Sequence, residues 1–228
     1  GEVEAALPAL AARGAALSLA VPSTAIGDAG LAALLRAAAS ASVEVRLWFL
    51  LPPEDGYWPN EDNLETFGAQ LTRLLDWLDA DGLVAAAIVS DLEPALAYSE
   101  ELRAGFASAS LDGLRTLMSA HVDPARYAAS RDALSAQVAA IQARGYRVHA
   151  VTYPQVVDDL GDGDADLQDA LDIPVDGVPF DEVAFMTYQT AFAEAQGAWV
   201  GPGLIRSYGA DAVARFGDRA TLALGIVG

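Results

Sequence analysis

The chain has 228 residues, 53% of them hydrophobic, and a net charge of −19 from 32 acidic and 13 basic residues. This composition supports one domain with a large core, and the negative charge argues against nucleic acid or an anionic membrane surface as a partner. All 13 basic residues are arginine and there is no cysteine, which excludes Schiff-base lysine enzymes, Walker-type phosphate loops, thiol nucleophiles and disulfides.

Apolar runs typical of strands alternate along the chain with helical patterns. Asp28 is placed to cap the first helix that follows a strand, and Gly145 closes the helix expected over residues 124–144. The expected strands cover residues 16–21, 43–51, 83–90, 146–152, 182–188 and 221–227. The expected helices cover residues 29–41, 64–79, 95–119, 124–144 and 203–216, and residues 158–169 read as a solvated acidic loop.

Six strands, each preceded by helical sequence and without hairpin signals, predict a parallel sheet. We expect a parallel (β/α)8 TIM barrel, a single domain over residues 1–228 that lacks its first and last strands and is truncated at both ends. An open doubly wound sheet is the main alternative. The barrel is preferred because polar residues recur at strand ends and no strand is followed by a glycine-rich phosphate turn.

Several absences narrow the expected partners. No run of about 20 apolar residues is free of charges and turn signals, so we expect no membrane insertion. No nucleotide-binding or nucleophile-elbow motif occurs, and two histidines make a histidine-rich zinc site improbable, so we expect no cofactor and no metal. Any targeting segment would lie before Gly1. Compartment and oligomeric state stay open, with an extracytoplasmic or secreted location slightly favoured.

Asp91 and Glu93 lie two residues apart at the end of the apolar strand 83–90, so both point the same way. If they face the barrel axis, each raises the pKa of the other and burial raises both, which favours one shared proton and a general acid near neutral pH. The alternative is structural: either acid could cap the helix that begins near Pro94.

These residues resemble motifs of the glycoside hydrolase family 18, or chitinase, superfamily. Its fourth strand ends in D-x-x-D-x-D-x-E, matched here by Asp91-Leu92-Glu93, and its sixth strand reads M-x-Y-D, matched by Met186-Thr187-Tyr188-Gln189. The resemblance implies that Glu93 protonates the glycosidic oxygen and that Asp91 orients the 2-acetamido group, which acts as the nucleophile. Tyr188 would hydrogen-bond that group, a substrate-assisted exception to the two-carboxylate scheme.

The chain departs from the family pattern at several positions. The two earlier aspartates of the motif fall on Ala86 and Val89, the aspartate after Tyr188 is Gln189, and the strand-three S-x-G-G pattern is absent. Two alternatives to a carbohydrate hydrolase therefore stay open. One is a barrel that binds carbohydrate or a partner without turnover. The other is a magnesium- or calcium-dependent hydrolase that uses the same acids as ligands.

Further candidates line the expected mouth of the barrel. Tyr57 and Trp58 could stack on sugar faces and Asn60, Glu61, Asp62 and Asn63 could bond hydroxyls, or Trp58 could pack under its own loop. Candidate substrate contacts are Tyr57, Trp58, Tyr153, Gln189 and Trp48, with Trp199 an ambiguous addition. Arg46 is unusual inside a strand. Pointing outward is favoured for it, while pointing inward would require Asp91 or Glu93 as a partner.

Overall fold

The computed structural model describes residues 1–107, 111–189 and 201–224. Its six strands form one sheet in sequence order, and every neighbouring pair is parallel. Helices lie between the strands, as parallel crossovers require, so the prediction of a parallel α/β sheet is confirmed. The strands are β1 (Leu17–Pro22), β2 (Val45–Leu50), β3 (Ala87–Leu92), β4 (Arg147–Thr152), β5 (Glu182–Met186) and β6 (Ala220–Ala223).

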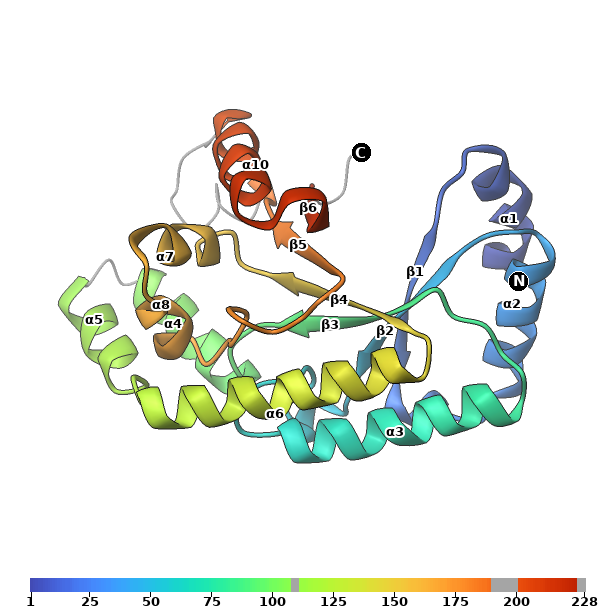
Figure 1. Ribbon diagram of the computed structural model, residues 1–228, viewed down its shortest axis with the longest axis horizontal. Coiled ribbons are helices and arrows are strands. Elements are labelled where there is room, and N and C mark those ends of the chain that lie inside the picture. The colour runs from blue at the N-terminus through green and yellow to red at the C-terminus, as the bar shows by residue number, and fades with distance from the viewer. Residues whose placement is uncertain (108–110, 190–200, 225–228) are drawn as a thin grey trace.

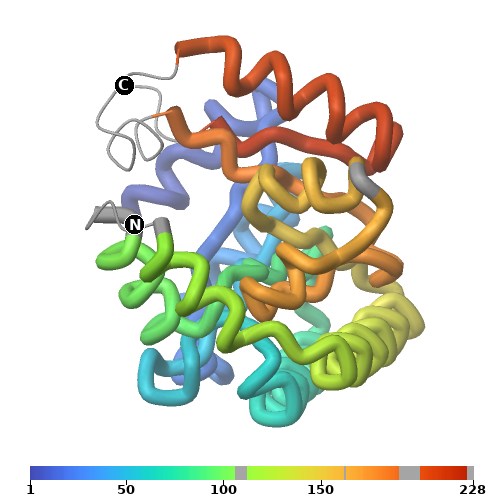
Figure 2. The backbone as a smooth tube through the Cα atoms, turned by 90° about the vertical axis from the view of Figure 1, so that its left-hand side faces the viewer, coloured from blue at the N-terminus to red at the C-terminus, as the bar shows by residue number. Residues whose placement is uncertain are grey.

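The helices surround the strands, with α3 and α6 on one side of the sheet and α10 on the opposite side of the molecule (Figures 1 and 2). No helix in the described ranges is long and apolar enough to cross a membrane. The α-helices are α1 (Glu2–Ala12), α2 (Ala29–Ser40), α3 (Leu64–Ala80), α4 (Leu96–Ala107), α5 (Leu111–Ser119), α6 (Pro124–Ala143), α7 (Val156–Asp162), α8 (Asp166–Ala170) and α10 (Gly203–Phe216). Short 3-10 turns are η1 (Ser23–Ala25), η2 (Pro53–Asp55) and η3 (Gly217–Arg219).

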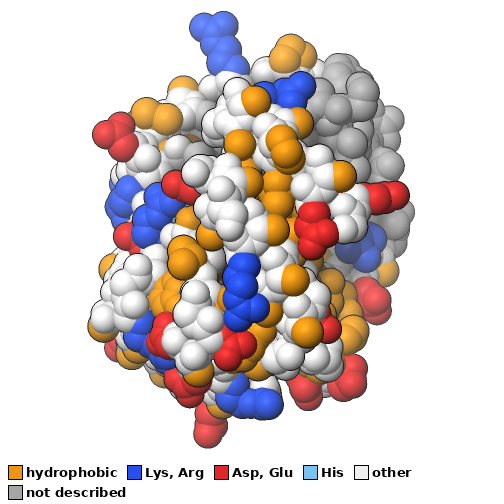
Figure 3. Space-filling view, turned by 90° about the vertical axis from the view of Figure 1, so that its right-hand side faces the viewer, with side chains coloured by type: hydrophobic (Ala, Val, Ile, Leu, Met, Phe, Trp, Pro, Cys, Tyr) orange, Lys and Arg blue, Asp and Glu red, His pale blue; other side chains and the backbone are white. Residues whose placement is uncertain are grey.

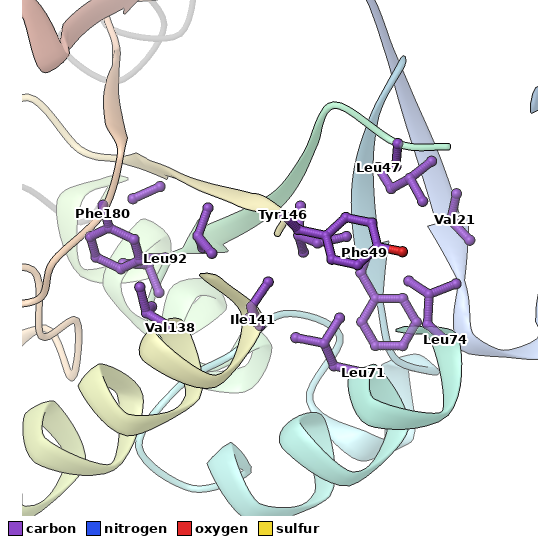
Figure 4. Close-up of a cluster of buried hydrophobic side chains, with 14 of the residues drawn as sticks. Val21, Leu47, Phe49, Leu71, Leu74, Leu92, Val138, Ile141, Tyr146 and Phe180 are labelled. Carbon is purple, nitrogen blue, oxygen red and sulfur yellow. The ribbon is translucent and has the colours of Figure 1, made fainter. Parts of the chain in front are cut away.

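The hydrophobic core lies between the strands and these helices. Leu47 and Phe49 point from β2 toward α3, where the ring of Phe49 meets Phe67 edge-on with centroids 5.4 Å apart. Leu71 and Leu74 of α3 pack into the same cluster (Figure 4). Alternate strand residues supply this layer because side chains on a strand point to opposite faces in turn. The other set of alternate residues is therefore free to line the second face of the sheet.

That second face is concave. Arg46 on β2 and Glu182 on β5 form an ion pair at 3.3 Å, although β3 and β4 lie between their strands. In a flat sheet with strands about 4.8 Å apart, β2 and β5 would be separated by roughly 14 Å, and side chains that stand upright on the sheet would not meet across that distance. The sheet therefore curls toward this face. Arg46 points inward, contrary to the favoured prediction, and its partner is Glu182 rather than Asp91 or Glu93.

The β1 edge of the sheet is less covered than its centre. Leu17 and Leu19 on the helix-facing side of β1 are only half-buried, and Ser18, Ala20 and Pro22 on the concave side are exposed. Figure 3 views the molecule from the side that carries α1 and shows hydrophobic side chains between charged ones. The buried centre at β3 contrasts with this edge, since all six β3 residues are buried.

Two predicted segments differ from the structure. Within residues 95–119 the structure describes two helices, α4 and α5, which pack against each other, and not the single helix expected. The acidic segment 158–169 is not a solvated loop. Much of it is helical, in α7 and α8, and the buried carboxylate of Asp159 accepts the backbone N–H of Leu167 and the side-chain amide of Gln168. These bonds give Asp159 partners that a purely compositional reading of the segment misses.

Candidate active site

Four polar side chains meet on the concave face at the carboxyl ends of three neighbouring strands. Asp91 lies in β3 opposite Val151 of β4, and Glu93 and Tyr153 each follow two residues later. The two-residue period therefore directs Glu93 and Tyr153 to the same face as Asp91. Tyr188 lies beyond the end of β5, and the charges of Asp91 and Glu93 act on its hydroxyl. The structure thus brings together all three predicted catalytic residues and one predicted substrate contact.

Asp91 is a buried acid with an unusual proton affinity. Its side chain is 6% exposed, and its Oδ1 atom is buried without a hydrogen-bond partner among the described residues. Burial, reinforced by the neighbouring charge of Glu93, raises the pKa of Asp91 to about 8. Asp91 therefore holds a proton at neutral pH, and a helix-capping role does not account for its position inside β3.

Glu93 is held in a more polar setting. Burial raises the pKa of its carboxyl, while the hydroxyl of Tyr153, which donates to Oε2 at 2.8 Å, and the Arg103 guanidinium act in the opposite direction. Nothing in the sequence marks Arg103 of α4, whose positive charge acts on Glu93. Two neighbouring carboxyls of raised pKa can share one proton, so this pair is suited to general acid–base catalysis.

Tyr188 and Gln189 follow β5 but have different surroundings. Tyr188 is half-buried, and burial raises its pKa, with the charges of Asp91 and Glu93 adding to the effect. This electrostatic influence places the Tyr188 hydroxyl near the acid pair. Gln189 instead donates from Nε2 to the carbonyl oxygen of Gly201 at 3.0 Å, which ties the end of β5 to the segment before α10. Trp199 lies outside the described residues.

Trp48 lies on the concave face of β2, paired with Val89, two residues before the level of Asp91. The ring is half-buried, and its indole Nε1 is buried without a hydrogen-bond partner in the part of the chain that the structure describes. Successive strand side chains point to opposite faces, so Trp48 and Asp91 share the concave face. The Trp48 ring therefore lies on that face one side-chain level before the acid pair. Lower on the same face, His149 lies 3.6 Å from Glu182, and burial lowers the pKa of its imidazole.

The aromatic pair of the loop after β2 is packed against the protein. Trp58 is 9% exposed, and its indole N–H donates to the carbonyl oxygen of Pro94 at 2.9 Å. Tyr57 is half-buried, lies edge-on to Trp58 with centroids 5.2 Å apart, and has a left-handed backbone with φ of 67°. Trp58 therefore packs under its own loop, which was the structural alternative, and its ring is not an open platform for a sugar.

The loop amides and acids are also occupied within the protein. The side-chain amides of Asn60 and Asn63 both donate to the carbonyl oxygen of Trp58, at 3.1 and 2.8 Å. Arg126 of α6 pairs with Glu61 at 3.0 Å and with Asp62 at 2.9 Å. For these four side chains the sequence left two interpretations open, contact with substrate hydroxyls or a structural role such as a helix cap at Asn60 or Asp62. The structure assigns them to holding the loop.

Behind this loop lies a cluster of polar side chains whose contacts were not predicted from the sequence. Asp172 contacts His121 at 2.8 Å, and the His121 ring stacks on Tyr98 with centroids 3.5 Å apart. Burial, followed by the charge of Asp172, raises the pKa of Glu61 to about 7. The members come from separate elements with no shared spacing, so no local pattern could have predicted that they meet.

Among residues 1–107, 111–189 and 201–224, no group of three or more His, Cys, Asp or Glu side chains is arranged to hold a metal ion. Comparison with known proteins adds no assignment. The chain matches no protein family model and no curated protein sequence.

Proposed function

We propose that the curled sheet is part of a β/α barrel and that its concave face carries a glycoside hydrolase site for an oligo- or polysaccharide. The observation that supports this most strongly is the pair Asp91 and Glu93, two acids of raised pKa at a strand end, with Tyr153 bonded to Glu93. Sites in β/α barrels are built at the carboxyl ends of the strands, where this pair lies. The Arg46–Glu182 contact supports the barrel, since it requires strong curvature.

In the proposed reaction Glu93 is the general acid. The proton of the pair, which rests mainly on Asp91, moves to Glu93 and then passes from the Glu93 carboxyl to the glycosidic oxygen as the bond between that oxygen and the anomeric carbon breaks. On a 2-acetamido sugar, the acetamido oxygen attacks the anomeric carbon, Asp91 accepts the acetamido N–H, and Tyr188 donates to the acetamido oxygen. Water then opens the cyclic intermediate, and the Glu93 carboxylate takes its proton. Asp91 and Glu93 share one proton in the resting site, so the chemistry balances without a cofactor.

The test is a panel of chromogenic glycosides that includes 2-acetamido sugars, measured with the wild-type chain and with Glu93→Gln. We expect Glu93→Gln to lower kcat by about 10²–10⁴ with a small change in KM, because a general acid contributes about that factor. Wild-type turnover should also fall above about pH 8, where the pair loses its shared proton. The exposed Glu65→Gln on α3 is the matched control.

A second candidate function is carbohydrate binding without turnover. It is favoured by Gln189, which stands where the family motif has an aspartate and whose amide is engaged with Gly201. Saccharide affinity without hydrolysis, and unchanged by Glu93→Gln, would select this function over the hydrolase. Activity that is abolished by a chelator and restored by magnesium or calcium would instead favour a metal-dependent hydrolase.

A further inference from the structure

The loop from Leu51 to Asn63, called here the Trp58 loop, is held by its own hydrogen bonds. The backbone N–H of Leu51 donates to the carbonyl oxygen of Tyr57 at 2.7 Å, which closes the loop at its base. The amides of Asn60 and Asn63 converge on the Trp58 carbonyl. Arg126 then anchors the far side through Glu61 and Asp62. The loop is therefore a folded unit that presents one buried side chain, Trp58, to a neighbouring segment.

That neighbouring segment begins directly after Glu93. The carbonyl oxygen of Pro94 accepts two hydrogen bonds at 2.9 Å, one from the indole N–H of Trp58 and one from the hydroxyl of Ser99. The Pro94 ring fixes its own φ and also restricts the backbone of the residue before it. Two donors on its carbonyl fix the orientation of the following peptide as well. The main chain that carries Glu93 is thus constrained on its carboxyl-terminal side.

Glu93 is constrained at its other end too. The Tyr153 hydroxyl holds Oε2 of its carboxyl group, and Asp91, Arg103 and Tyr188 are the other titratable or charged groups whose charges act around the pair. A carboxyl in such a site must be held within about 0.5 Å of its working position. Tyr153 controls the carboxyl, while the Pro94 carbonyl controls the main chain from which Glu93 projects.

We propose that Trp58 is a positioning residue for Glu93, which acts through the hydrogen bond from its indole N–H to the Pro94 carbonyl oxygen and does not contact the substrate. The placement of the carboxyl follows from the structure alone. Its consequence for turnover rests on the proposed hydrolase function. The low exposure of Trp58 and its buried donor argue against the sugar-stacking role that its sequence position suggests.

The test replaces Trp58 with Phe, which keeps an aromatic ring and removes the N–H. Protein labelled with ¹³C at glutamate carboxyls is titrated by NMR, with the Glu93 resonance assigned from Glu93→Gln. We expect the apparent pKa of Glu93 to shift by half a unit or more in Trp58→Phe, because the carboxyl changes its burial and its contact with Tyr153. If glycoside turnover is established, kcat should fall by about tenfold with KM changed less than twofold.

Trp77→Phe is the matched control, because it also removes one indole hydrogen bond, the 3.1 Å bond to Asp81, on the exposed side of α3. It should leave the Glu93 titration and any turnover unchanged. An unchanged Glu93 titration in folded Trp58→Phe would overturn the proposal. Absence of turnover in the wild type would overturn the proposed hydrolase function. The Glu93 titration would still decide whether Trp58 positions Glu93.

Ser99→Ala supplies a second test if Trp58→Phe does not fold. It removes the other donor to the Pro94 carbonyl with a smaller loss of volume. The expected result is a measurable shift of the Glu93 pKa from its wild-type value. In the wild type, the Trp58 indole proton should exchange with solvent at least tenfold more slowly than that of Trp77. Fast exchange of the Trp58 proton together with an unshifted Ser99→Ala titration would refute the role.

Discussion

At the scale of single residues, two neighbouring acids differ in what surrounds them. Within the described part of the chain, Asp91 is buried with an unpartnered oxygen, whereas Glu93 accepts a hydrogen bond from Tyr153 and is subject to the charge of Arg103. Burial therefore acts almost unopposed on Asp91 and is partly offset at Glu93. The proton that the pair retains at neutral pH is held mainly by Asp91. This asymmetry has a consequence for folding stability that can be measured without a substrate.

We predict that Asp91→Asn stabilises the fold increasingly as the pH rises. The pKa of Asp91 is raised to about 8, so the folded chain keeps a proton that the unfolded chain loses near pH 4. The wild type therefore loses stability between about pH 4 and 8, and asparagine removes that titration. By pH 7 the difference should reach on the order of 2–4 kcal/mol in urea unfolding.

The control for this prediction is Asp132→Asn, a change at a surface carboxyl that is 76% exposed. Its stability should run parallel to that of the wild type at every pH. Parallel curves for Asp91→Asn as well would mean that Asp91 ionises normally in the folded protein, and the shared proton of the proposed mechanism would lose its support.

At the scale of elements, the Trp58 loop depends on one left-handed glycine. Gly56 has φ of 94°, and a Cβ atom added there would collide with the side-chain amide of Asn63. The same amide donates a hydrogen bond to the Trp58 carbonyl oxygen. A side chain at position 56 would therefore displace the Asn63 amide that holds the Trp58 backbone. The loop therefore needs glycine at this position for two reasons, the backbone angle and the close approach of Asn63.

We predict that Gly56→Ala costs roughly 1 kcal/mol more in unfolding free energy than Gly27→Ala. Gly27 also has a positive φ, of 85°, but nothing lies within 4 Å of its added Cβ, so its substitution reports the backbone strain alone. Chemical denaturation of both variants measures the difference. Equal losses of unfolding free energy in the two variants would show that Asn63 moves aside freely and that its hydrogen bond to the Trp58 carbonyl oxygen is weak.

At the scale of the whole molecule, the curl of the sheet joins strands that are distant in order. Arg46 and Glu182 connect β2 to β5 across the concave face, and Glu182 also accepts from the Thr221 hydroxyl of β6 at 2.9 Å. Their side chains are 30% and 18% exposed, so the pair is only partly screened by water. If one of the two side chains were replaced, the charge of the other would stay partly buried without a partner, which destabilises the fold.

We predict a coupling free energy of roughly 1–2 kcal/mol between Arg46 and Glu182, measured by a double-mutant cycle with Arg46→Met and Glu182→Gln. The surface pair Arg147–Glu44, at 3.6 Å between the first residue of β4 and the residue before β2, is more exposed; it serves as the control and should couple by less than about 0.5 kcal/mol. Equal coupling energies would mean that the charges do not meet across the sheet, and the curvature would need another explanation.

The sequence by itself determined the local elements and their order. The continuous apolar run 83–90 reflects burial of a strand on both faces, and the spacing of Leu71, Leu74 and Leu78 reflects burial of a helix on one side. Both are local properties and can be read along the chain. The same period of two placed Asp91 and Glu93 on one face before any contact was known. The N-terminal cap at Asp28, whose carboxylate accepts the Leu31 N–H at 2.7 Å, was equally readable.

Only the tertiary structure decided which side chains meet. The partner of Arg46 is 136 residues away and is brought within reach by the curl of the sheet. The indole N–H of Trp58 donates to a carbonyl 36 residues later, and the raised pKa of Glu61 depends on its burial and on the charge of Asp172. Such contacts arise where separate elements pack, and hydrogen bonds in loops follow no period. Local patterns in the sequence therefore could not predict them.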